Sequence, residues 1–359
     1  MVRVRVPFAV SLAVVAAALA LAGARQLHAA ADSLPARLTD EEFWKLSSDM
    51  SEPNGEFRSE NLLSNELFYP EVIPPLIQQA VPGRVYLGVG PEQNFNYIVA
   101  IKPKMAFITD IRRGNLHTQL MYKALFEMSE DRADFVSRLF TQERPEGLGR
   151  ESTVKEIIDK YWEIQTSSEA EYKRNVQAIK DHLTKSPHHF PLGPEDLEGI
   201  EGVYWYFYWY GLPINYNSST NGGGFRGNMA NYASLMVAVD SSGVSRSYLA
   251  TDAGFRFMKD LESRNLVVPV VGNFGGPKAL RAVGQYVRDH GAVVSAFYLS
   301  NVEQYLRLDG LLGAFCANVA SMPLDEASTF IRSQSGGGGG IGFRNYLGLM
   351  QSETRACAN

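Results

Sequence analysis

Short apolar runs alternate with amphipathic segments along much of the chain. Runs at residues 85–87, 105–108, 266–271 and 292–299 have the length of buried strands, and turn or polar residues follow each of them. Apolar residues at helical spacing follow, most clearly between residues 115 and 128. This repeated strand–turn–helix order predicts an α/β protein with a doubly wound sheet.

The stretch from Arg132 onward interrupts that alternation. Apolar positions around residues 135–140 and 157–164 predict two amphipathic helices, and strand patterns are rare until about residue 250. We therefore expect a helical insertion at about 132–250 inside an α/β domain of residues 81–359. A helical lead-in is expected at residues 32–80.

Three local patterns predict where helices begin. Thr39-Asp-Glu-Glu42 forms a capping box before a short helix, and Thr251 can cap a helix that runs to Arg264. Pro277 is expected at the first position of a helix over residues 278–290.

The chain contains an unusually aromatic run from Val203 to Tyr210. It suits either a packing face between insertion and core or the wall of a binding cleft. The glycine-containing segment Asn215–Gly227 beside it would serve as a lid in the second interpretation. The glycine run Gly336–Gly340 predicts a flexible loop or hinge. It is not a phosphate-binding loop, because no Gly-Lys-Ser/Thr follows it.

The first 31 residues have the layout of a secretory signal peptide. Arg3 and Arg5 precede the apolar run Pro7–Gly23, and Ala29–Ala31 offers a cleavage site. Export to the periplasm or the outside is therefore expected. The alternative is an uncleaved membrane anchor, which would be the chain's only membrane contact.

Charge narrows the choice of partners. The 359-residue chain has a formal net charge of −5, and removing residues 1–31 removes three arginines and no acid, which gives −8. An acidic chain without a basic cluster argues against nucleic acid as the partner and favours a small-molecule ligand. The oligomeric state stays open.

The two cysteines are Cys316 and Cys357. In an oxidising compartment they could form a disulfide that holds the C-terminal tail, and the alternative is two separate thiols.

The candidate ligand site begins at a glycine turn. Gly88 and Gly90 follow the first apolar run, and Asp110 ends the second run, where it could accept hydrogen bonds from ribose hydroxyls. Glu92 stands where a dinucleotide site needs glycine, and its carboxylate would repel a pyrophosphate. A ligand with a ribose and a cationic amino-acid part fits better, and S-adenosylmethionine is such a ligand.

Polar and aromatic residues at the later strand ends complete this site. Asn273 and Phe274 follow the third strand, and Tyr298, Ser300 and Asn301 end the fourth. Because ligands of open α/β sheets bind beyond the carboxyl ends of the strands, these residues are candidates for the acceptor side. The structural alternatives are that the two asparagines are helix caps and that the glycines serve a tight turn. Asp110 could pair with Arg112 or cap the following helix.

Other chemistries fit the sequence less well. No Gly-x-Ser-x-Gly elbow of an α/β hydrolase occurs. The histidines lack metal-ligand spacing, and His188-His189 beside Pro187 and Pro191 is interpreted as a loop. No metal site is therefore expected.

The motifs Leu87-Gly-Val-Gly-Pro-Glu92 and Asp110 resemble the glycine motif and ribose acid of class I methyltransferases. More closely, segments such as Val-Gly-Asn-Phe-Gly-Gly-Pro-Lys-Ala-Leu-Arg and Phe-Tyr-Leu-Ser-Asn-Val-Glu-Gln-Tyr-Leu resemble uncharacterised bacterial proteins described as methyltransferase-like. The resemblance covers about residues 81–333. The chain departs from the enzymes at Tyr86, where they usually carry an acid, and at Glu92.

The resemblance implies a Rossmann-like fold of the class I methyltransferase type. It implies S-adenosylmethionine as the cofactor at Gly88, Gly90, Glu92 and Asp110. It also implies Asn273 near the transferred methyl group, with Tyr298 as a candidate acid or base. Export conflicts with a cofactor made in the cytosol, so the alternative is an exported, non-catalytic binding protein on the same fold.

Overall fold

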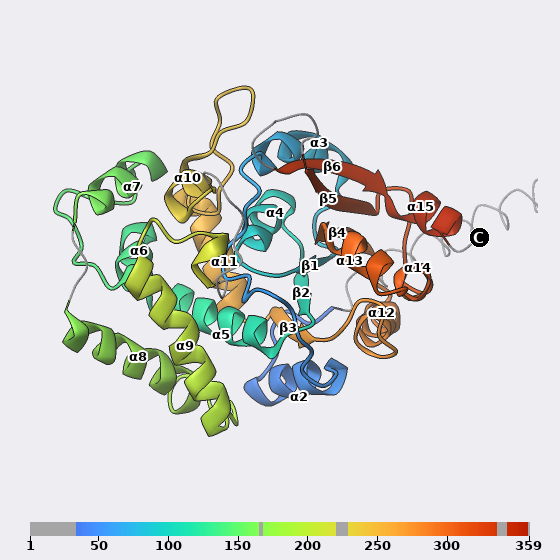
Figure 1. Ribbon diagram of the computed structural model, residues 1–359, viewed down its shortest axis with the longest axis horizontal. Coiled ribbons are helices and arrows are strands. Elements are labelled where there is room, and N and C mark those ends of the chain that lie inside the picture. Colours follow the sequence, from blue (N-terminus) through green and yellow to red (C-terminus); the bar gives the residue numbers. More distant parts are fainter. Residues whose placement is uncertain (1–33, 165–167, 220–228, 336–342, 358–359) are drawn as a thin grey trace, which may run out of the picture.

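A computed structural model describes residues 34–164, 168–219, 229–335 and 343–357. Its six strands form one sheet in the order β3-β2-β1-β4-β5-β6 (Figure 1). Neighbouring strands are parallel except β6, which runs antiparallel to β5. The strands are β1 Val85–Val89, β2 Met105–Asp110, β3 Val267–Val271, β4 Val294–Ser300, β5 Thr329–Ser335 and β6 Phe343–Leu349. The mixed α/β architecture expected from the sequence is confirmed.

The apolar runs form the central strands because both faces of the sheet are covered. Every residue of β1, β2 and β3 is buried. In the middle of the sheet Leu87 is in register with Phe107 on one side and Phe297 on the other. Parallel strands buried on two faces need continuous apolar runs, which is the pattern of this sequence.

Helices lie on both sides of the sheet (Figure 1). Helix α11 contacts α4 and α5 on one side, and α12 contacts α2 and α14 on the other. The α-helices are α2 Asp40–Met50, α3 Ile73–Gln79, α4 Gln93–Ile101, α5 Arg113–Met128, α6 Arg132–Phe140, α7 Val154–Trp162, α8 Glu169–Thr184, α9 Pro194–Tyr210, α10 Tyr232–Val237, α11 Asp252–Ser263, α12 Ala279–Asp289, α13 Val302–Leu308, α14 Leu312–Ala320 and α15 Met350–Cys357. Two 3-10 helices, η1 Tyr69–Val72 and η2 Tyr216–Ser219, complete the described elements.

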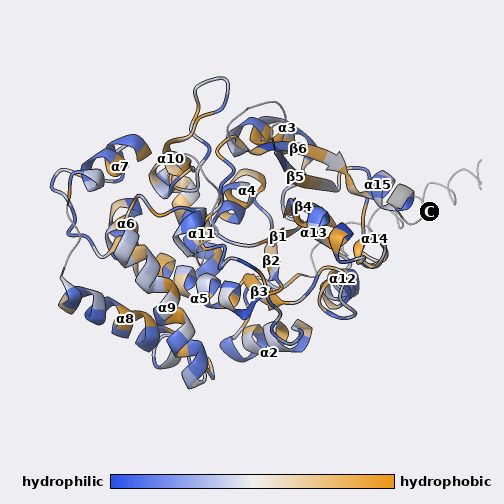
Figure 2. Cartoon of the chain, in the orientation of Figure 1, coloured by the Kyte–Doolittle hydropathy of each residue, from blue (hydrophilic) through white to orange (hydrophobic). Residues whose placement is uncertain are grey.

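Helices α6 to α10 occupy the stretch where the sequence predicts an insertion, and three of them, α6, α8 and α9, pack against α5. Helix α5 contacts α6, α8, α9 and α11. Its residues from Asn115 to Phe126 are all buried, so it is enclosed rather than one-sided. Figure 2 shows that the outer helix α8 carries both hydrophilic and hydrophobic residues, as expected for a helix with one buried face.

Two of the three predicted helix starts are confirmed. Thr39 and Glu42 form the capping box of α2, and the Thr251 hydroxyl accepts a hydrogen bond from the amide of Gly254. The prediction for Pro277 is wrong, because α12 begins at Ala279 and Lys278 is its N-cap. The backbone amides of Lys278 and Ala279 at this helix start donate instead to the carboxylate of Glu52, which comes from a distant segment.

Residues 51–66, named here the crossing segment, pass over the carboxyl ends of four strands in their order in the sheet. The amide of Glu52 donates to the carbonyl of Val271 after β3 (2.7 Å), and that of Gly55 to the carbonyl of Ile111 after β2 (2.8 Å). The amide of Ser64 donates to the Glu92 carboxylate after β1, and the Glu66 carboxylate accepts from the hydroxyl of Ser300 in β4. The crossing segment thus covers the edge where the predicted site residues lie.

Several predictions concern residues outside the described part of the chain. The signal peptide, the Gly336–Gly340 loop and most of the proposed lid segment, residues 220–228, belong to this group. Among the described residues, no helix has the length and hydrophobicity needed to cross a membrane. Cys316 is disulfide-bonded, so the interpretation as two separate thiols is wrong; the sequence contains one other cysteine, Cys357.

Replacing Glu52 with glutamine should lower the free energy of unfolding by about 1–3 kcal/mol. The Glu52 carboxylate accepts hydrogen bonds from the backbone amides of Asn273 (3.1 Å), Lys278 (2.8 Å) and Ala279 (2.9 Å). Urea denaturation of Glu52→Gln beside Glu326→Gln, which changes an exposed carboxylate, measures the difference. Equal stability of the two variants would contradict this account of α12.

Candidate functional site

A cavity of about 370 Å³ lies at the carboxyl ends of β1 to β4. The strand order reverses between β1 and β4, and such a reversal leaves a crevice beyond the strand ends. The volume lies in the range typical of small-molecule sites. Each of the four strands contributes to the lining at or just beyond its carboxyl end: Val89 and Pro91 for β1, Asp110 and Ile111 for β2, Gly272, Asn273 and Phe274 for β3, and Tyr298, Ser300, Asn301 and Val302 for β4.

The crossing segment forms a second wall that sequence reasoning did not place at the site. It contributes charged, polar and aromatic side chains, namely Glu56, Phe57, Arg58, Asn61, Ser64, Asn65 and Glu66. From the sequence, residues 32–80 were expected to form a helical lead-in, whereas residues 51–66 form the crossing segment. The polar composition between Pro53 and Asn65, with little helical spacing, was the available indication of an extended segment.

Asp110 lies at the end of β2, faces the cavity and is only 5% exposed. One carboxylate oxygen accepts a hydrogen bond from the amide of Arg112 (3.0 Å) and lies 3.5 Å from the Arg112 guanidinium. Burial raises the pKa of Asp110 above its ordinary value, and the positive charge of Arg112 opposes this. The predicted pairing with Arg112 therefore occurs at a residue that also lines the cavity.

Tyr298, Ser300 and Glu66 form a polar cluster at the end of β4. The Ser300 hydroxyl donates to the Glu66 carboxylate (2.5 Å), and the Asn345 side chain donates to the other oxygen of Glu66. Burial raises the pKa of Tyr298 well above its ordinary value, and the negative charge of Glu66 adds to the shift. Tyr298 therefore keeps its proton at neutral pH and can donate a hydrogen bond rather than act as a base.

Ser300 also has an unusual backbone conformation. Its φ of 51° lies in the left-handed region, which costs a residue other than glycine about 1–3 kcal/mol. The same residue lines the cavity and breaks the register between β4 and β5. Strain of this kind persists where surrounding contacts enforce it, and here the bond to Glu66 is such a contact.

Asn273, Phe274 and Asn301 all reach the cavity wall, with different local roles. The Asn273 side-chain oxygen accepts from the amide of Gly275 (2.9 Å), so it stabilises the turn after β3 and does not cap α12. Phe274 is 4% exposed and packs against Phe297 with ring centroids 5.4 Å apart. Asn301 occupies the N-cap position of α13 without a side-chain capping hydrogen bond.

Gly88 and Gly90 do not line the cavity, although Val89 and Pro91 of the same turn do. The side-chain amide of Asn94 donates to the carbonyls of Val89 (2.9 Å), Gly90 (3.2 Å) and Pro91 (2.7 Å). Gly90 has a φ of 75°, and a Cβ on Gly88 would lie 1.7 Å from the Asn94 side-chain oxygen. Both glycines are therefore needed to fold the turn around Asn94, which is the structural alternative given for them above.

Glu92 is also absent from the lining, because it is fully buried beneath the crossing segment. Its carboxylate accepts from the amide of Ser64 at 3.2 and 3.3 Å. Burial raises the pKa of Glu92 to about 8, so the side chain is mostly neutral at pH 7. Glu92 thus connects the turn to the crossing segment and does not face a ligand in the cavity.

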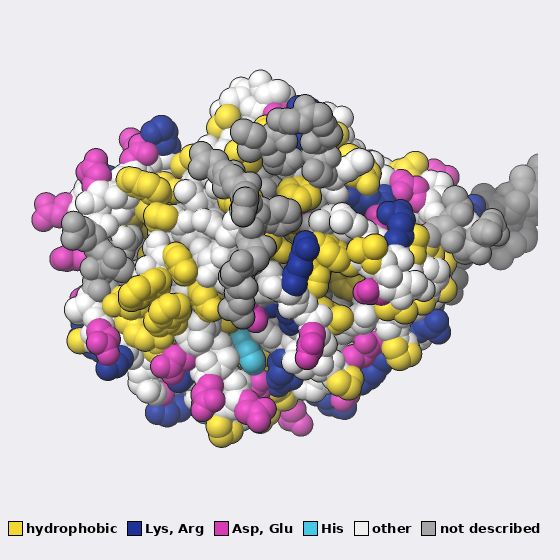
Figure 3. All heavy atoms as spheres, in the orientation of Figure 1, with side chains coloured by type: hydrophobic (Ala, Val, Ile, Leu, Met, Phe, Trp, Pro, Cys, Tyr) yellow, Lys and Arg dark blue, Asp and Glu magenta, His cyan; other side chains and the backbone are white. Residues whose placement is uncertain are grey.

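The aromatic run lies on α9 and does not line the cavity. Tyr204 and Phe207 are buried, whereas Trp205 and Trp209 are 38% and 61% exposed. Hydrophobic side chains gather on this face of the insertion (Figure 3). The buried side of the run packs against the protein interior, as the packing-face interpretation predicts, and the exposed side lies outside the cavity.

The cavity combines acidic groups with an aromatic wall. Its acids are Glu56, Glu66, Asp110 and Asp309, and Arg58 is the one basic residue among the described lining residues. The Arg58 guanidinium donates to the Tyr305 hydroxyl (2.6 Å), and the ring of Tyr305 meets that of Phe57 edge to face at 5.0 Å. Such a site can accept hydrogen bonds from hydroxyl groups, attract a cation and stack a planar ring.

Replacing Gly88 with alanine should destabilise the protein by about 1–3 kcal/mol, since the added methyl group overlaps the Asn94 oxygen. Gly313→Ala is the matched control. Its Cβ would have no atom within 4 Å, and it lies in the first turn of α14. Thermal unfolding of the two variants should show a loss for Gly88→Ala alone, and an equal change in both would refute this role of Asn94.

The stability of the wild type should fall relative to Glu92→Gln as the pH rises from about 4.5 to about 8. In this window the folded protein keeps Glu92 protonated, whereas the unfolded chain has released the proton from a carboxyl whose ordinary pKa is 4.5. Rising pH therefore favours unfolding, by at most about 1.4 kcal/mol per pH unit for this one group. Urea denaturation at several pH values compares the two proteins, and parallel curves would show that Glu92 titrates normally.

Comparison with known proteins identifies a family but no activity. No curated protein matches the chain in sequence. The profile of a family described as a domain of unknown function, DUF7790, matches residues 62–352 and so spans the sheet, the insertion and most of the cavity lining. The chain belongs to this family of unknown function, DUF7790.

Proposed function

We propose that the cavity at the strand ends binds S-adenosylmethionine and that the protein is a methyltransferase-like protein. The observation that supports this most is the position of Asp110, at the end of the strand beside β1 and on the cavity wall. An acid at that place in a nucleotide-binding α/β fold accepts hydrogen bonds from ribose hydroxyls. The strand order supports a Rossmann-like sheet, and the antiparallel β6 is the departure from an all-parallel one.

The charges of the cavity favour this ligand over a dinucleotide. Four acidic side chains and one basic side chain line it, so a pyrophosphate would meet net repulsion. S-adenosylmethionine has no phosphate and carries a positive sulfonium and an ammonium group. Phe57 and Tyr305 supply aromatic surface for the adenine ring, and the buried Glu66 supplies negative charge at the end of β4.

Methyl transfer would depend on positioning. Tyr298 keeps its proton, and the Asn273 oxygen is already bonded to the Gly275 amide, so neither is a ready proton acceptor. In-line placement of an acceptor against the methyl group can supply most of the rate without a dedicated base. The acceptor would lie near Asn273, Phe274, Ser300 and Asn301.

The lack of a ready base among the predicted catalytic residues favours one second candidate. In it the protein is exported and binds a nucleoside-like ligand in the same cavity without turning it over. The predicted signal peptide is consistent with that function, since little S-adenosylmethionine is found outside the cytosol. Both candidates place the ligand against Asp110.

Calorimetric titration with S-adenosylmethionine should show micromolar binding that Asp110→Asn weakens at least about ten-fold, as expected for loss of a hydrogen-bonded charge. Asp289→Asn, an exposed acid on α12, is the control and should bind as the wild type does. No binding by folded wild type would reject the ligand, and equal binding by Asp110→Asn would reject the site. Formation of S-adenosylhomocysteine with candidate acceptors then separates the enzyme from the binding protein.

A further inference from the structure

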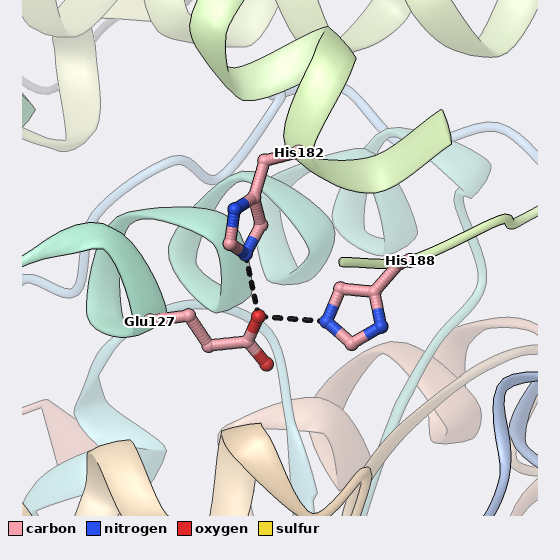
Figure 4. A group of neighbouring side chains, drawn as sticks. All are labelled: Glu127, His182 and His188. Carbon is pink, nitrogen blue, oxygen red and sulfur yellow. Dashed lines mark hydrogen bonds and ion pairs between the residues drawn. The ribbon is translucent and has the colours of Figure 1, made fainter. Parts of the chain in front are cut away.

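Three ligand-type side chains converge at a second place, outside the cavity. Glu127 lies near the end of α5, His182 near the end of α8, and His188 between α8 and α9. Their ligand atoms all lie within 4.8 Å of one another. Figure 4 shows the two imidazole rings directed at one oxygen of Glu127, at distances of 2.6 Å from His182 Nε2 and 2.7 Å from His188 Nε2.

The other polar atoms of two of these residues already have partners. His188 Nδ1 lies 2.8 Å from the carboxylate of Asp40, and the second oxygen of Glu127 lies 2.8 Å from Lys123 Nζ. Asp40 is itself held by the side-chain amide of Asn265 at 2.9 Å. Histidines that bind metals usually donate their other ring nitrogen to a carboxylate in this way, which fixes the ring and its tautomer.

Hydrogen bonding alone satisfies this arrangement only if both ring nitrogens of His188 carry a proton. A neutral imidazole has one N–H, so a neutral His188 that donates Nδ1–H to Asp40 presents an Nε2 lone pair to a carboxylate oxygen. Two acceptors would then face each other in a place where the side chains of Glu127, His182 and His188 are 6%, 13% and 7% exposed. A cation between Nε2 and the carboxylate removes that conflict and leaves the bond to Asp40 in place.

We propose that Glu127, His182 and His188 bind one divalent metal ion with the ligand preference of Zn²⁺. Two imidazole nitrogens and one carboxylate oxygen form a ligand set that Zn²⁺ accepts, with metal–ligand distances of about 2.0–2.2 Å. Tetrahedral geometry at those distances separates the ligand atoms by about 3.3 Å, so the present nitrogen–oxygen distances need to open by roughly 0.6 Å. Lys123 does not compete, because it binds the other Glu127 oxygen.

The ion would stabilise the junction of segments that are far apart in sequence. Its ligands come from α5, α8 and the segment before α9, and Asp40 adds α2 through His188. The burial of all three ligands leaves little room for a substrate, which indicates a structural role. None of these residues lines the cavity, so the inference stands apart from the proposed function.

Isothermal titration of the chelator-treated protein with Zn²⁺ should give one equivalent per chain and raise the unfolding temperature. His182→Gln and His188→Gln should each weaken binding more than ten-fold, and Asp40→Asn about ten-fold or more through loss of the orienting carboxylate. His189→Gln is the matched control. His189 is the exposed neighbour of His188, and among the described residues its hydrogen bond to Asp40 comes from the backbone amide, which the substitution keeps. It should bind Zn²⁺ as the wild type does.

X-ray absorption of the zinc-loaded wild type keeps the test independent of variants that fail to fold. Two imidazole ligands and at least one oxygen ligand per zinc ion are expected. Folded wild type that takes up no zinc would overturn the proposal and leave a hydrogen-bonded cluster with a protonated histidine. A zinc ion with fewer than two imidazole ligands, or an equal loss of binding in His189→Gln, would overturn it as well.

Discussion

The rest of this structure depends on the hydrogen bonds and ion pairs that the carboxylates of the crossing segment, residues 51–66, form at the strand ends. Parallel strands end in a row of backbone groups and helix starts that need polar partners, and the crossing segment supplies them strand by strand. Glu52 binds the amides ahead of α12, Glu60 pairs with Arg112 at 2.8 Å, and Glu66 binds Ser300. Because these contacts hold the segment over the strand ends, Glu66 and other residues of the segment form the second wall of the cavity. The same segment therefore covers the carboxyl edge of the sheet and lines the cavity.

Sequence patterns predicted β1 to β4 well, because burial on two faces leaves continuous apolar runs, but they did not predict β5 and β6. The strands around Leu87, Phe107 and Val268 are buried throughout and mostly apolar, and Asp110, Asn273 and Ser300 at the strand ends reach one cavity because parallel strands end together. The glycine turn shows the limit of the same reasoning. Its spacing matched a ligand loop, yet Gly88 makes room for the Asn94 side chain and Gly90 supplies the positive φ of the turn. Asn94 binds backbone carbonyls and the Tyr86 hydroxyl, and these contacts leave no sequence pattern.

Long-range polar contacts explain the remaining misses. Pro277 had the right local context for a helix start, but Glu52, more than 200 residues earlier, shifted that start by binding the amides of Lys278 and Ala279. In the same way, no spacing rule relates Glu127 to His182 and His188, because α5 and α8 meet only through tertiary packing. The proline-flanked His188 was interpreted as a loop residue, and it is one. Its burial beside two carboxylates was not visible in the chain order.

The polar cluster at the cavity joins residues from the two ends of the described chain. Glu66, in the first fifth of the chain, binds Asn345 on the edge strand β6, 279 positions later. A nascent chain, or one cut short before β6, therefore lacks part of this polar cluster however well its earlier strands have paired. Contacts that close loops of this size form only after much of the intervening structure is in place. The polar cluster at the cavity is therefore complete only when β6 has been synthesised and has joined the sheet.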